Sequence, residues 1–365
     1  MRSEAISLLE KFTQAHGAPG AEAPVREVLE QALEGCGEFE RDRLGGLASR
    51  LKNSSKDEDA PRVLVLAHLD EVGFMVQNIT SDGFLQFLPL GGWWSHSLLA
   101  QRVRIRTRSG EEHTGVVASQ PPHFLGEDAK NKVVPIDKLF IDVGAESDDD
   151  VTERLGIQLG DSIVPDSEFT ALSHPDRYVS KAFDNRVGCA LAAQAGKTLS
   201  SASSQLSCIA YFGASVQEEV GTRGATVLSR ILKPDVAIIL EGPPADDTPG
   251  LPEAERQGAL NGGVQIRLYD PSALMSLPLA DFITQVAKDE KIPFQQTVRR
   301  SGGTDARTTT LANAGVPCVV LGVPARYIHS HSSILDMRDY EAALSLVSAA
   351  VARMDAKTVS GFLPT

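Results

Sequence analysis

The chain has 365 residues, of which 42% are hydrophobic, and a formal net charge of −13. This length predicts one large domain or two smaller ones, and the hydrophobic content is ordinary for a globular core. The negative charge disfavours a nucleic-acid backbone or an anionic membrane as a partner. The N-terminal segment MRSEAISLLEKF contains acidic residues, and no apolar run approaches the ~20 residues of a membrane span, so we expect a cytoplasmic protein without a signal peptide.

The N-terminal part of the chain predicts two helices, then strand and loop. Apolar residues at helical spacing around Leu9 and Leu29 indicate two amphipathic helices. A strand-like pattern follows from Phe39 to Leu51, and the charged segment 53–60 is typical of an exposed loop.

The stretch VLVLAHLDEVGFMV, residues 63–76, predicts a buried strand with polar groups at its end. Open α/β sheets bind ligands at the carboxyl ends of such strands. Residues two apart in extended chain share a face, so Asp70 could orient the ring of His68 toward a metal. A strand end whose polar residues merely face water also explains the pair, because His-x-Asp is common.

Residues 77–171 show short strand patterns separated by turns. In RVRIRTR, Val103, Ile105 and Thr107 alternate with arginines, which indicates a half-buried strand with one basic face. We interpret these arginines as a solvated face or an interface rim. The pattern predicts a small β-rich domain, 77–171, inserted into a larger domain formed by 1–76 and 172–365.

Strands alternate with helices from Ser180 onward. Helical patterns occupy 187–199, 279–290 and 340–354, and apolar strand patterns occupy 206–213, 236–240 and 316–321. This alternation predicts an α/β fold with a mixed, largely parallel sheet flanked by helices.

Acidic residues and histidines stand at or just after several of these strands. They are His68, Asp70, Asp184, Glu218, Glu219, Glu241 and His329. Each has an ordinary explanation alone, since adjacent glutamates are usually a solvated pair and an aspartate before a helix is usually its N-cap. Together, two histidines and several carboxylates at one sheet edge form a ligand set for two divalent ions about 3.5–4 Å apart.

The donor types also predict the metal and its chemistry. Nitrogen and oxygen ligands without thiolate suit zinc, cobalt or manganese. Two such ions would polarise a carbonyl and lower the pKa of bound water to roughly 7. The Glu218-Glu219 doublet can supply one metal ligand and one general base.

A set of short motifs, in this order along the chain, is highly specific as a group. They are AHLDEVGFMV, PPHFL, FIDVGA, GD-x-IVPDSEF, KAFDNRVGC, QEEVGTRGA, DDTPG, SGGTDA and RYIHS. Through them the chain resembles, over nearly its whole length, the tetrahedral (TET) di-metal aminopeptidases. That family includes glutamyl and deblocking aminopeptidases, and some members are labelled as cellulases or endoglucanases.

The resemblance implies a fold of the zinc-peptidase type and a role for each site residue. His68 would bind the first metal with Asp70 orienting it, and Asp184 would bridge the two ions. Glu218 would be the general base. The remaining metal ligands would be Glu219, Glu241 and His329.

The resemblance also implies an assembly. The inserted block would be a PDZ-like dimerisation domain, and dimers would form a hollow tetrahedral dodecamer that peptides enter through pores. Two positions depart from the family pattern. Glu241 stands where most members have aspartate, and the segment 42–46 replaces Asp-x-x-Gly-Asn with DRLGG, which loses a structural asparagine.

Other residues near these motifs have less specific interpretations. His331 lies two residues after His329 and could compete with it as a ligand. Trp93 and Trp94 are expected at an interface. Asp305 is expected near the N-cap of a helix close to the site.

We therefore predict a metal-dependent aminopeptidase that removes N-terminal residues from peptides. A di-metal amidohydrolase of small acylated amino acids would share the ligands and differ in its pocket. A glycosidase would need two carboxylates and no metal, so the histidines disfavour it. A non-catalytic, shell-forming scaffold would not need Glu218.

Overall fold

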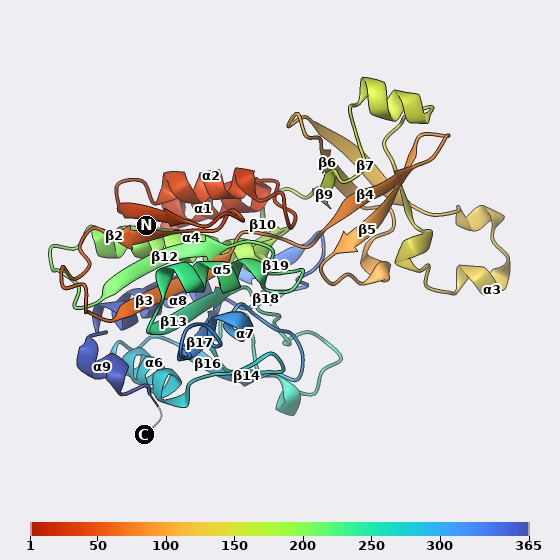
Figure 1. The fold of residues 1–365 in the computed structure, drawn as a ribbon. Helices are drawn as coiled ribbons and strands as arrows, with labels where there is room; N and C mark the ends of the chain where they lie inside the picture. Colours follow the sequence, from red (N-terminus) through yellow and green to blue (C-terminus); the bar gives the residue numbers. More distant parts are fainter. Residues whose placement is uncertain (1, 364–365) are drawn as a thin grey trace.

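A nine-stranded sheet forms the centre of the main domain (Figure 1). The computed structural model describes residues 2–363. The strands of this sheet are β1 (Gly37–Arg41), β2 (Leu47–Leu51), β3 (Arg62–His68), β12 (Ile209–Ser215), β13 (Val236–Glu241), β14 (Val264–Asp270), β15 (Ala273–Leu274), β16 (Phe294–Val298) and β17 (Cys318–Gly322). Their order is β1-β2-β12-β3-β13-β17-β14-β15, and β16 pairs with β14.

The four central strands, β12, β3, β13 and β17, run parallel, so their carboxyl ends meet at one edge. Strand β3 is buried on both faces, as its apolar run predicts. Val63 and Val65 pack into the larger hydrophobic core on one face of the sheet, and Leu64 and Leu66 pack into the core on the other. The sheet therefore requires helices on both sides.

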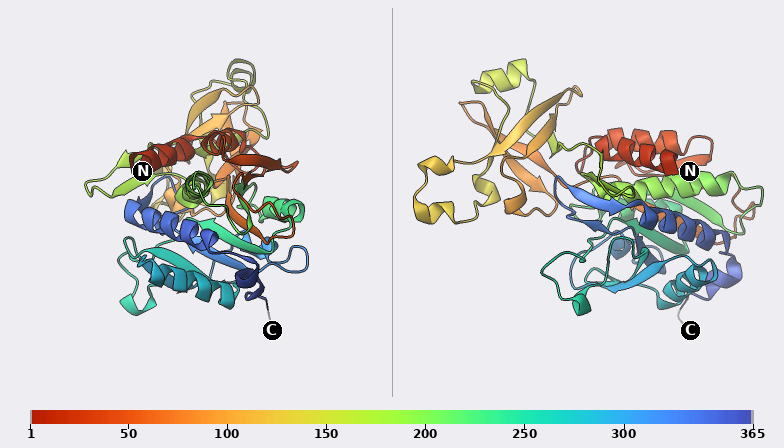
Figure 2. Two further views of the ribbon diagram at one scale, coloured as in Figure 1. Left: turned by 90° about the vertical axis from the view of Figure 1, so that its left-hand side faces the viewer. Right: turned by 180° about the vertical axis from the view of Figure 1, so that it is seen from behind.

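Helices cover both faces of this sheet (Figures 1 and 2). On the larger core lie α1 (Arg2–Gln14), α2 (Ala23–Ala32), α4 (Phe183–Ser200), α6 (Leu277–Asp289), α8 (Met337–Ala352) and α9 (Ala356–Ser360). On the smaller core lie α5 (Arg223–Leu232) and α7 (Ala306–Thr309). None of the described helices is long and apolar enough to cross a lipid bilayer.

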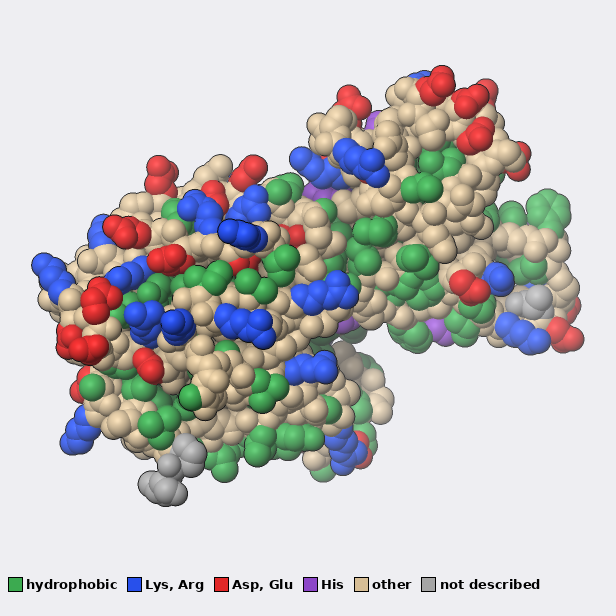
Figure 3. Space-filling model, in the orientation of Figure 1, with side chains coloured by type: hydrophobic (Ala, Val, Ile, Leu, Met, Phe, Trp, Pro, Cys, Tyr) green, Lys and Arg blue, Asp and Glu red, His purple; other side chains and the backbone are tan. Residues whose placement is uncertain are grey.

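A closed β-barrel projects from one end of the main domain (Figure 1). Its strands are β4 (Gly73–Ile79), β5 (Phe84–Leu90), β6 (Arg102–Arg106), β7 (Glu112–Ala118), β8 (Phe140–Asp142) and β9 (Ser162–Pro165), with the short helix α3 (Glu127–Lys130) between β7 and β8. Val103 and Ile105 of β6 enter its core. Acidic side chains gather at one end of the barrel (Figure 3), where the segment 146–154 carries them.

The arginines of β6, expected to form a solvated face or an interface rim, make ion pairs within the chain. Arg104 pairs with Glu112, at 3.3 Å between Nη1 and Oε2, and its Nη2 donates to the carbonyl of Gln14 at 2.9 Å. Arg106 pairs with the same glutamate at 3.1 Å. Because Gln14 ends α1, Arg104 joins the barrel to the main domain.

A small sheet supports the loop that carries the second histidine. Its strands are β10 (Thr170–Ala171), β11 (Arg177–Ser180), β18 (Ala325–Arg326) and β19 (Ser333–Asp336), in the order β10-β11-β19-β18. His329 lies in the connection between β18 and β19.

The mixed, mostly parallel sheet with flanking helices and an inserted β-barrel confirms the predicted fold class. The region from Phe39 to Leu51 is a hairpin, because Asp42 Oδ1 accepts three backbone N–H groups and closes a turn between β1 and β2. Trp93 stacks on Phe74 at 4.6 Å between ring centroids and belongs to the barrel, whereas Trp94 is 69% exposed.

Candidate metal centre

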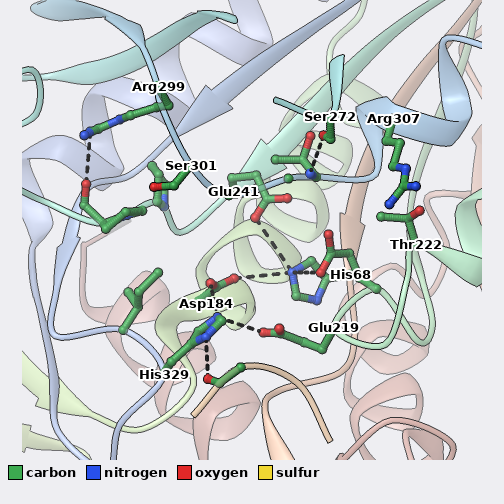
Figure 4. A pocket seen from close by; sticks show the side chains of 18 of the residues that line it. His68, Asp184, Glu219, Thr222, Glu241, Ser272, Arg299, Ser301, Arg307 and His329 are labelled. Atoms are coloured by element: carbon green, nitrogen blue, oxygen red, sulfur yellow. Dashed lines mark hydrogen bonds and ion pairs between the residues drawn. The ribbon is translucent and has the colours of Figure 1, made fainter. Parts of the chain in front are cut away.

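The predicted site residues meet at the carboxyl edge of the parallel strands, around a cavity of about 410 Å³ (Figure 4). His68 is the last residue of β3, and Glu241 is the last residue of the neighbouring β13. Glu218 and Glu219 follow β12, which flanks β3 on its other side. Asp184 comes from the first turn of α4. Sheet topology thus brings distant motifs to one place.

Asp184 lies between the two histidines. Its Oδ1 is 3.3 Å from His68 Nε2, and its Oδ2 is 3.4 Å from His329 Nε2. The backbone of Asp184 is non-helical (φ −82°, ψ 106°), so its side chain enters the cavity and does not cap α4. One carboxylate therefore faces two separate imidazoles, each with one of its oxygens.

Each histidine has a further carboxylate beside it. Glu241 Oε2 lies 3.7 Å from His68 Nε2, and Glu219 Oε1 lies 3.3 Å from His329 Nε2. Ligand atoms of His68, Asp184 and Glu219 all lie within 4.8 Å of one another. The cluster consists of two histidine–carboxylate pairs that share Asp184.

Both imidazoles are oriented through their second nitrogen. His68 Nδ1 is 3.1 Å from the carbonyl oxygen of Asp70 and 3.4 Å from its Oδ1. His329 Nδ1 is 2.8 Å from the carbonyl oxygen of Gly92, in the loop that follows β5 of the barrel. A proton on Nδ1 directs the Nε2 lone pair into the cavity, as metal-binding histidines require.

Asp70 also fixes the glutamate doublet. Its Oδ1 and Oδ2 accept the backbone N–H groups of Glu218 and Glu219, each at 3.0 Å. The side chain of Glu218 turns into the cavity, where its Oε2 is 3.9 Å from His68 Nε2. Asp70 itself is fully buried.

The cluster carries more negative than positive charge. Burial raises the pKa of Glu218 well above its usual range and raises those of Glu219 and Glu241. Burial alone would lower the pKa of His329, but Asp184 and Glu219 raise it to about 11. These shifts mean that the site favours added positive charge.

Divalent cations would supply this positive charge. Within the described residues, Glu241 Oε1 and Glu219 Oε1 are buried without a hydrogen-bond donor. Two imidazole nitrogens with carboxylate oxygens and no thiolate are the donor set of zinc, cobalt or manganese. The residues present therefore fit a pair of divalent ions.

Two other predictions have different outcomes. His331 turns toward the barrel, with Nε2 2.9 Å from the carbonyl oxygen of Arg102, and does not join the cluster. Asp305 precedes α7 but makes no capping bond. Its Oδ2 instead accepts from Ser215 Oγ, and burial raises its pKa to about 7.

Three arginines that line the cavity were missed from the sequence: Arg267, Arg299 and Arg307. They come from β14, from the residue after β16 and from α7, and no motif joins them. Only the three-dimensional arrangement brings them to the site.

Known proteins share this fold and sequence. Glutamyl aminopeptidase of Lactococcus lactis subsp. cremoris is 35% identical over 359 residues, which cover 98% of each chain. Lysyl aminopeptidase of Pyrococcus furiosus is 33% identical and covers 94% of this chain and 95% of its own.

Solved structures agree with these relatives. The crystal structure of a TET aminopeptidase from a marine sediment Thaumarchaeota archaeon has a TM-score of 0.94 at 38% identity and covers 99% of each chain. The Pyrococcus horikoshii TET1 peptidase, described as able to assemble into a tetrahedron or a large octahedral shell, has a TM-score of 0.84 at 29% identity and covers 96% of this chain and 100% of its own. Residues 46–346 match the family described as M42 glutamyl aminopeptidase. The chain belongs to this family, and it is an aminopeptidase.

Proposed function

We propose that the chain is a di-metal aminopeptidase in which Asp184 would be shared by two ions. His68 and Glu241 would hold one ion, and His329 and Glu219 would hold the other. The observation that carries this proposal is the placement of the two Asp184 oxygens, 3.3 and 3.4 Å from two different imidazoles. When bound, zinc, cobalt or manganese ions act as Lewis acids that polarise the scissile carbonyl and lower the pKa of water.

Glu218 is the proposed general base. Its carboxylate faces the cavity, and Asp70 fixes its backbone. Burial raises its pKa, which suits a group that must take a proton and return it. Glu218 accepts a proton from the attacking water and donates it to the leaving amine as the peptide C–N bond breaks.

The excess of carboxylates explains cleavage at the N-terminus. A peptide's free ammonium group is attracted by the anionic groups around Asp184 and Glu219, which positions the first peptide bond beside Glu218. An N-acetylated peptide lacks this charge, so we expect it to be cut poorly. Equal cleavage of acetylated and free peptides would contradict this arrangement.

We further propose that the block 77–171 is a dimerisation domain of the catalytic unit formed by 1–76 and 172–365, and that dimers build a tetrahedral dodecamer. The TET1 relative supports the assembly. Trp94 and Phe124 of the block are 69% and 76% exposed, and such aromatics are enriched at interfaces. Light scattering is expected to give a dodecamer, and a stable monomer would contradict the proposal.

The central experiment is hydrolysis of a panel of aminoacyl-anilides by metal-stripped protein, before and after addition of zinc, cobalt or manganese. We expect metal to restore cleavage and Glu218→Gln to abolish it while both ions remain bound. Two bound ions without cleavage of any anilide would favour an acyl-amino-acid amidohydrolase. Failure to bind metal would overturn the ligand assignment.

A further inference from the structure

A buried carboxyl group joins the wall of the cavity to the strand ends of the candidate metal centre. Residues 301–304 line the cavity, and Asp305 follows them directly without being part of the lining. Asp305 is 1% exposed, and its partner Ser215, the last residue of β12, is fully buried. The mechanism proposed above uses neither side chain.

The carboxyl group of Asp305 depends on Ser215 for its hydrogen bonding. Its Oδ2 accepts from the Ser215 hydroxyl, and its Oδ1 is buried without a partner among the described residues. Burial raises the pKa of this carboxyl group to about 7, and the charges of Glu241 and Asp70 act in the same direction. A carboxyl group buried beside other acids lowers stability, which favours a role in the site over a role in packing.

Ser215 contacts the residues on both sides of His68. In the parallel pairing of β12 with β3, Ser215 lies opposite His68. Its Oγ is 3.3 Å from the carbonyl oxygen of Ala67, and its own carbonyl oxygen accepts the backbone N–H of Leu69 at 2.9 Å. A shift of Ser215 would therefore move the backbone that carries His68.

Ser215 also begins the segment that carries the glutamate doublet. Glu218 and Glu219 follow it within the next four residues, and Asp70 accepts the backbone N–H groups of both. Gln217 has a left-handed backbone (φ 57°), so the chain turns sharply between Ser215 and Glu218. The hydroxyl of Ser215 and the carboxylate of Asp70 thus hold this segment at two separate points.

The backbone around Asp305 is itself well anchored. The Asp305 carbonyl oxygen accepts the N–H of Thr309 at 3.0 Å, and Thr304 Oγ1 accepts the N–H of Ala306 at 3.2 Å. From α5, Ser229 Oγ donates to Thr309 Oγ1 at 3.4 Å. The carboxyl group therefore stands on a rigid element, as a group that fixes the position of others requires.

We infer that Asp305 is a positioning residue of the metal centre: through Ser215 it fixes the ends of β12 and β3, and with them Glu218 and His68. The inference rests on the roles proposed for those two residues. Misplacement of catalytic groups by about 1 Å can cost roughly 100-fold in rate. A role in packing alone would instead change stability and leave the reaction unaltered.

The test measures kcat and KM separately, with the metal-loaded, full-length enzyme and the anilide that wild type cleaves best. Ser215→Ala removes the donor, and Asp305→Leu removes the acceptor. We expect each to lower kcat about tenfold, the scale of one hydrogen bond to a charged group, while KM stays near its wild-type value. The double variant should lose no more than either single variant, because the two side chains form one contact.

Two further variants separate the hydrogen bond from charge and from packing. Asp305→Asn removes the charge but keeps an oxygen that can accept from Ser215, so it should recover most of the kcat lost in Asp305→Leu. Ser229→Ala is the matched control, because it removes a buried hydroxyl that bonds to the same helix α7. It should lower thermal stability and keep the wild-type kcat.

The visible absorption spectrum of the cobalt-loaded protein gives a readout that does not depend on turnover. It reports the geometry of the ligands around the ion. The spectrum should change in Ser215→Ala and in Asp305→Leu, and it should match wild type in Ser229→Ala. If Asp305→Leu does not fold, Ser215→Ala carries the comparison, since it removes a single oxygen atom.

Outcomes for the proposed function and for this inference are distinct. Wild-type kcat with an unchanged cobalt spectrum in Ser215→Ala would overturn the inference and leave the di-metal mechanism intact. Additive losses in the double variant, or an Asp305→Asn enzyme as impaired as Asp305→Leu, would also overturn it. Failure of the wild-type protein to bind metal would overturn the proposed function and the inference together.

Discussion

Asp70 lies between His68 and Glu218: its Oδ1 is 3.4 Å from His68 Nδ1 and accepts the Glu218 backbone N–H at 3.0 Å. One carboxylate thus sets the orientation of a proposed metal ligand and of the proposed general base. We predict that Asp70→Asn lowers kcat/KM and metal affinity by about 10–100-fold, because an amide cannot accept with both of its terminal atoms.

Metal titration and kinetics on the same preparation would check this prediction. Circular dichroism serves as the control for folding. Unchanged metal affinity and unchanged kcat/KM in the variant would show that neither orientation depends on Asp70.

Glu241→Ala should lose one metal ion per subunit. Glu241 Oε2 is 3.7 Å from His68 Nε2, and its Oε1 is buried without a donor among the described residues, so the carboxylate is poised for a cation. Metal content after dialysis, measured by mass spectrometry, tests the prediction. Glu241→Asp, which keeps a carboxylate, is the conservative control and should retain both ions. Full occupancy in the alanine variant would remove Glu241 from the ligand set.

Gly242→Ala should damage the site more than the fold. A Cβ at this position would lie 2.6 Å from the Phe183 carbonyl oxygen and 3.0 Å from Asp184 Cα, so the backbone that carries the proposed bridging carboxylate must shift. Misplacement by about 1 Å can cost roughly 100-fold in rate. Assays of kcat/KM should show such a loss.

Gly126→Ala is the matched control, because a Cβ there meets nothing within 4 Å. We expect this variant to behave like wild type in activity. A Gly242→Ala enzyme with wild-type kcat/KM would mean that the Asp184 segment adjusts without cost.

The stability of the junction between barrel and main domain should depend on His16. Its Nε2 lies 2.8 Å from Ser162 Oγ of β9, and burial, with the charges of Lys181 and Arg104, lowers its pKa from 6.5 to about 2. Below pH 6.5 the unfolded chain binds a proton that the folded chain does not bind. The free energy of unfolding should therefore fall as the pH drops from about 6.5, by at most about 1.4 kcal/mol per pH unit from this group.

Urea unfolding of metal-free protein at pH 7, 6 and 5 would measure this slope. His16→Gln should reduce it, while His96→Gln, at an exposed position, should keep the slope of wild type. Equal slopes for His16→Gln and wild type would assign the acid sensitivity to other groups.

The sequence predicts the strand-end groups well because their placement follows from local patterns. His68 and Glu241 end apolar strands, and parallel neighbours in a sheet must present such ends together. The arginines that line the cavity follow no such rule, since Arg267, Arg299 and Arg307 reach it only through the packing of separate elements. The acceptor for His329 is the backbone carbonyl of Gly92. Because every residue has a backbone carbonyl, the sequence does not indicate which one contacts His329.

Turn chemistry and side-chain choice explain the local differences. Asp42 closes a turn inside the strand-like segment 39–51, so the structure divides this segment into the two strands of a hairpin. Asp305 has the position of a cap, but Ser215 of the neighbouring strand offers it a buried partner. Both outcomes depend on contacts that helical or strand periodicity does not encode.

The hydrogen bond from His329 to the Gly92 carbonyl has a consequence for how this molecule can be shortened. That carbonyl belongs to the loop after β5, so the inserted segment supplies part of the setting for a histidine more than two hundred positions later in the chain. Excising the barrel to obtain a minimal enzyme would remove the acceptor that selects the His329 tautomer. A shortened enzyme must therefore keep that loop or supply another acceptor for His329 Nδ1, even if every side chain proposed to bind metal is retained.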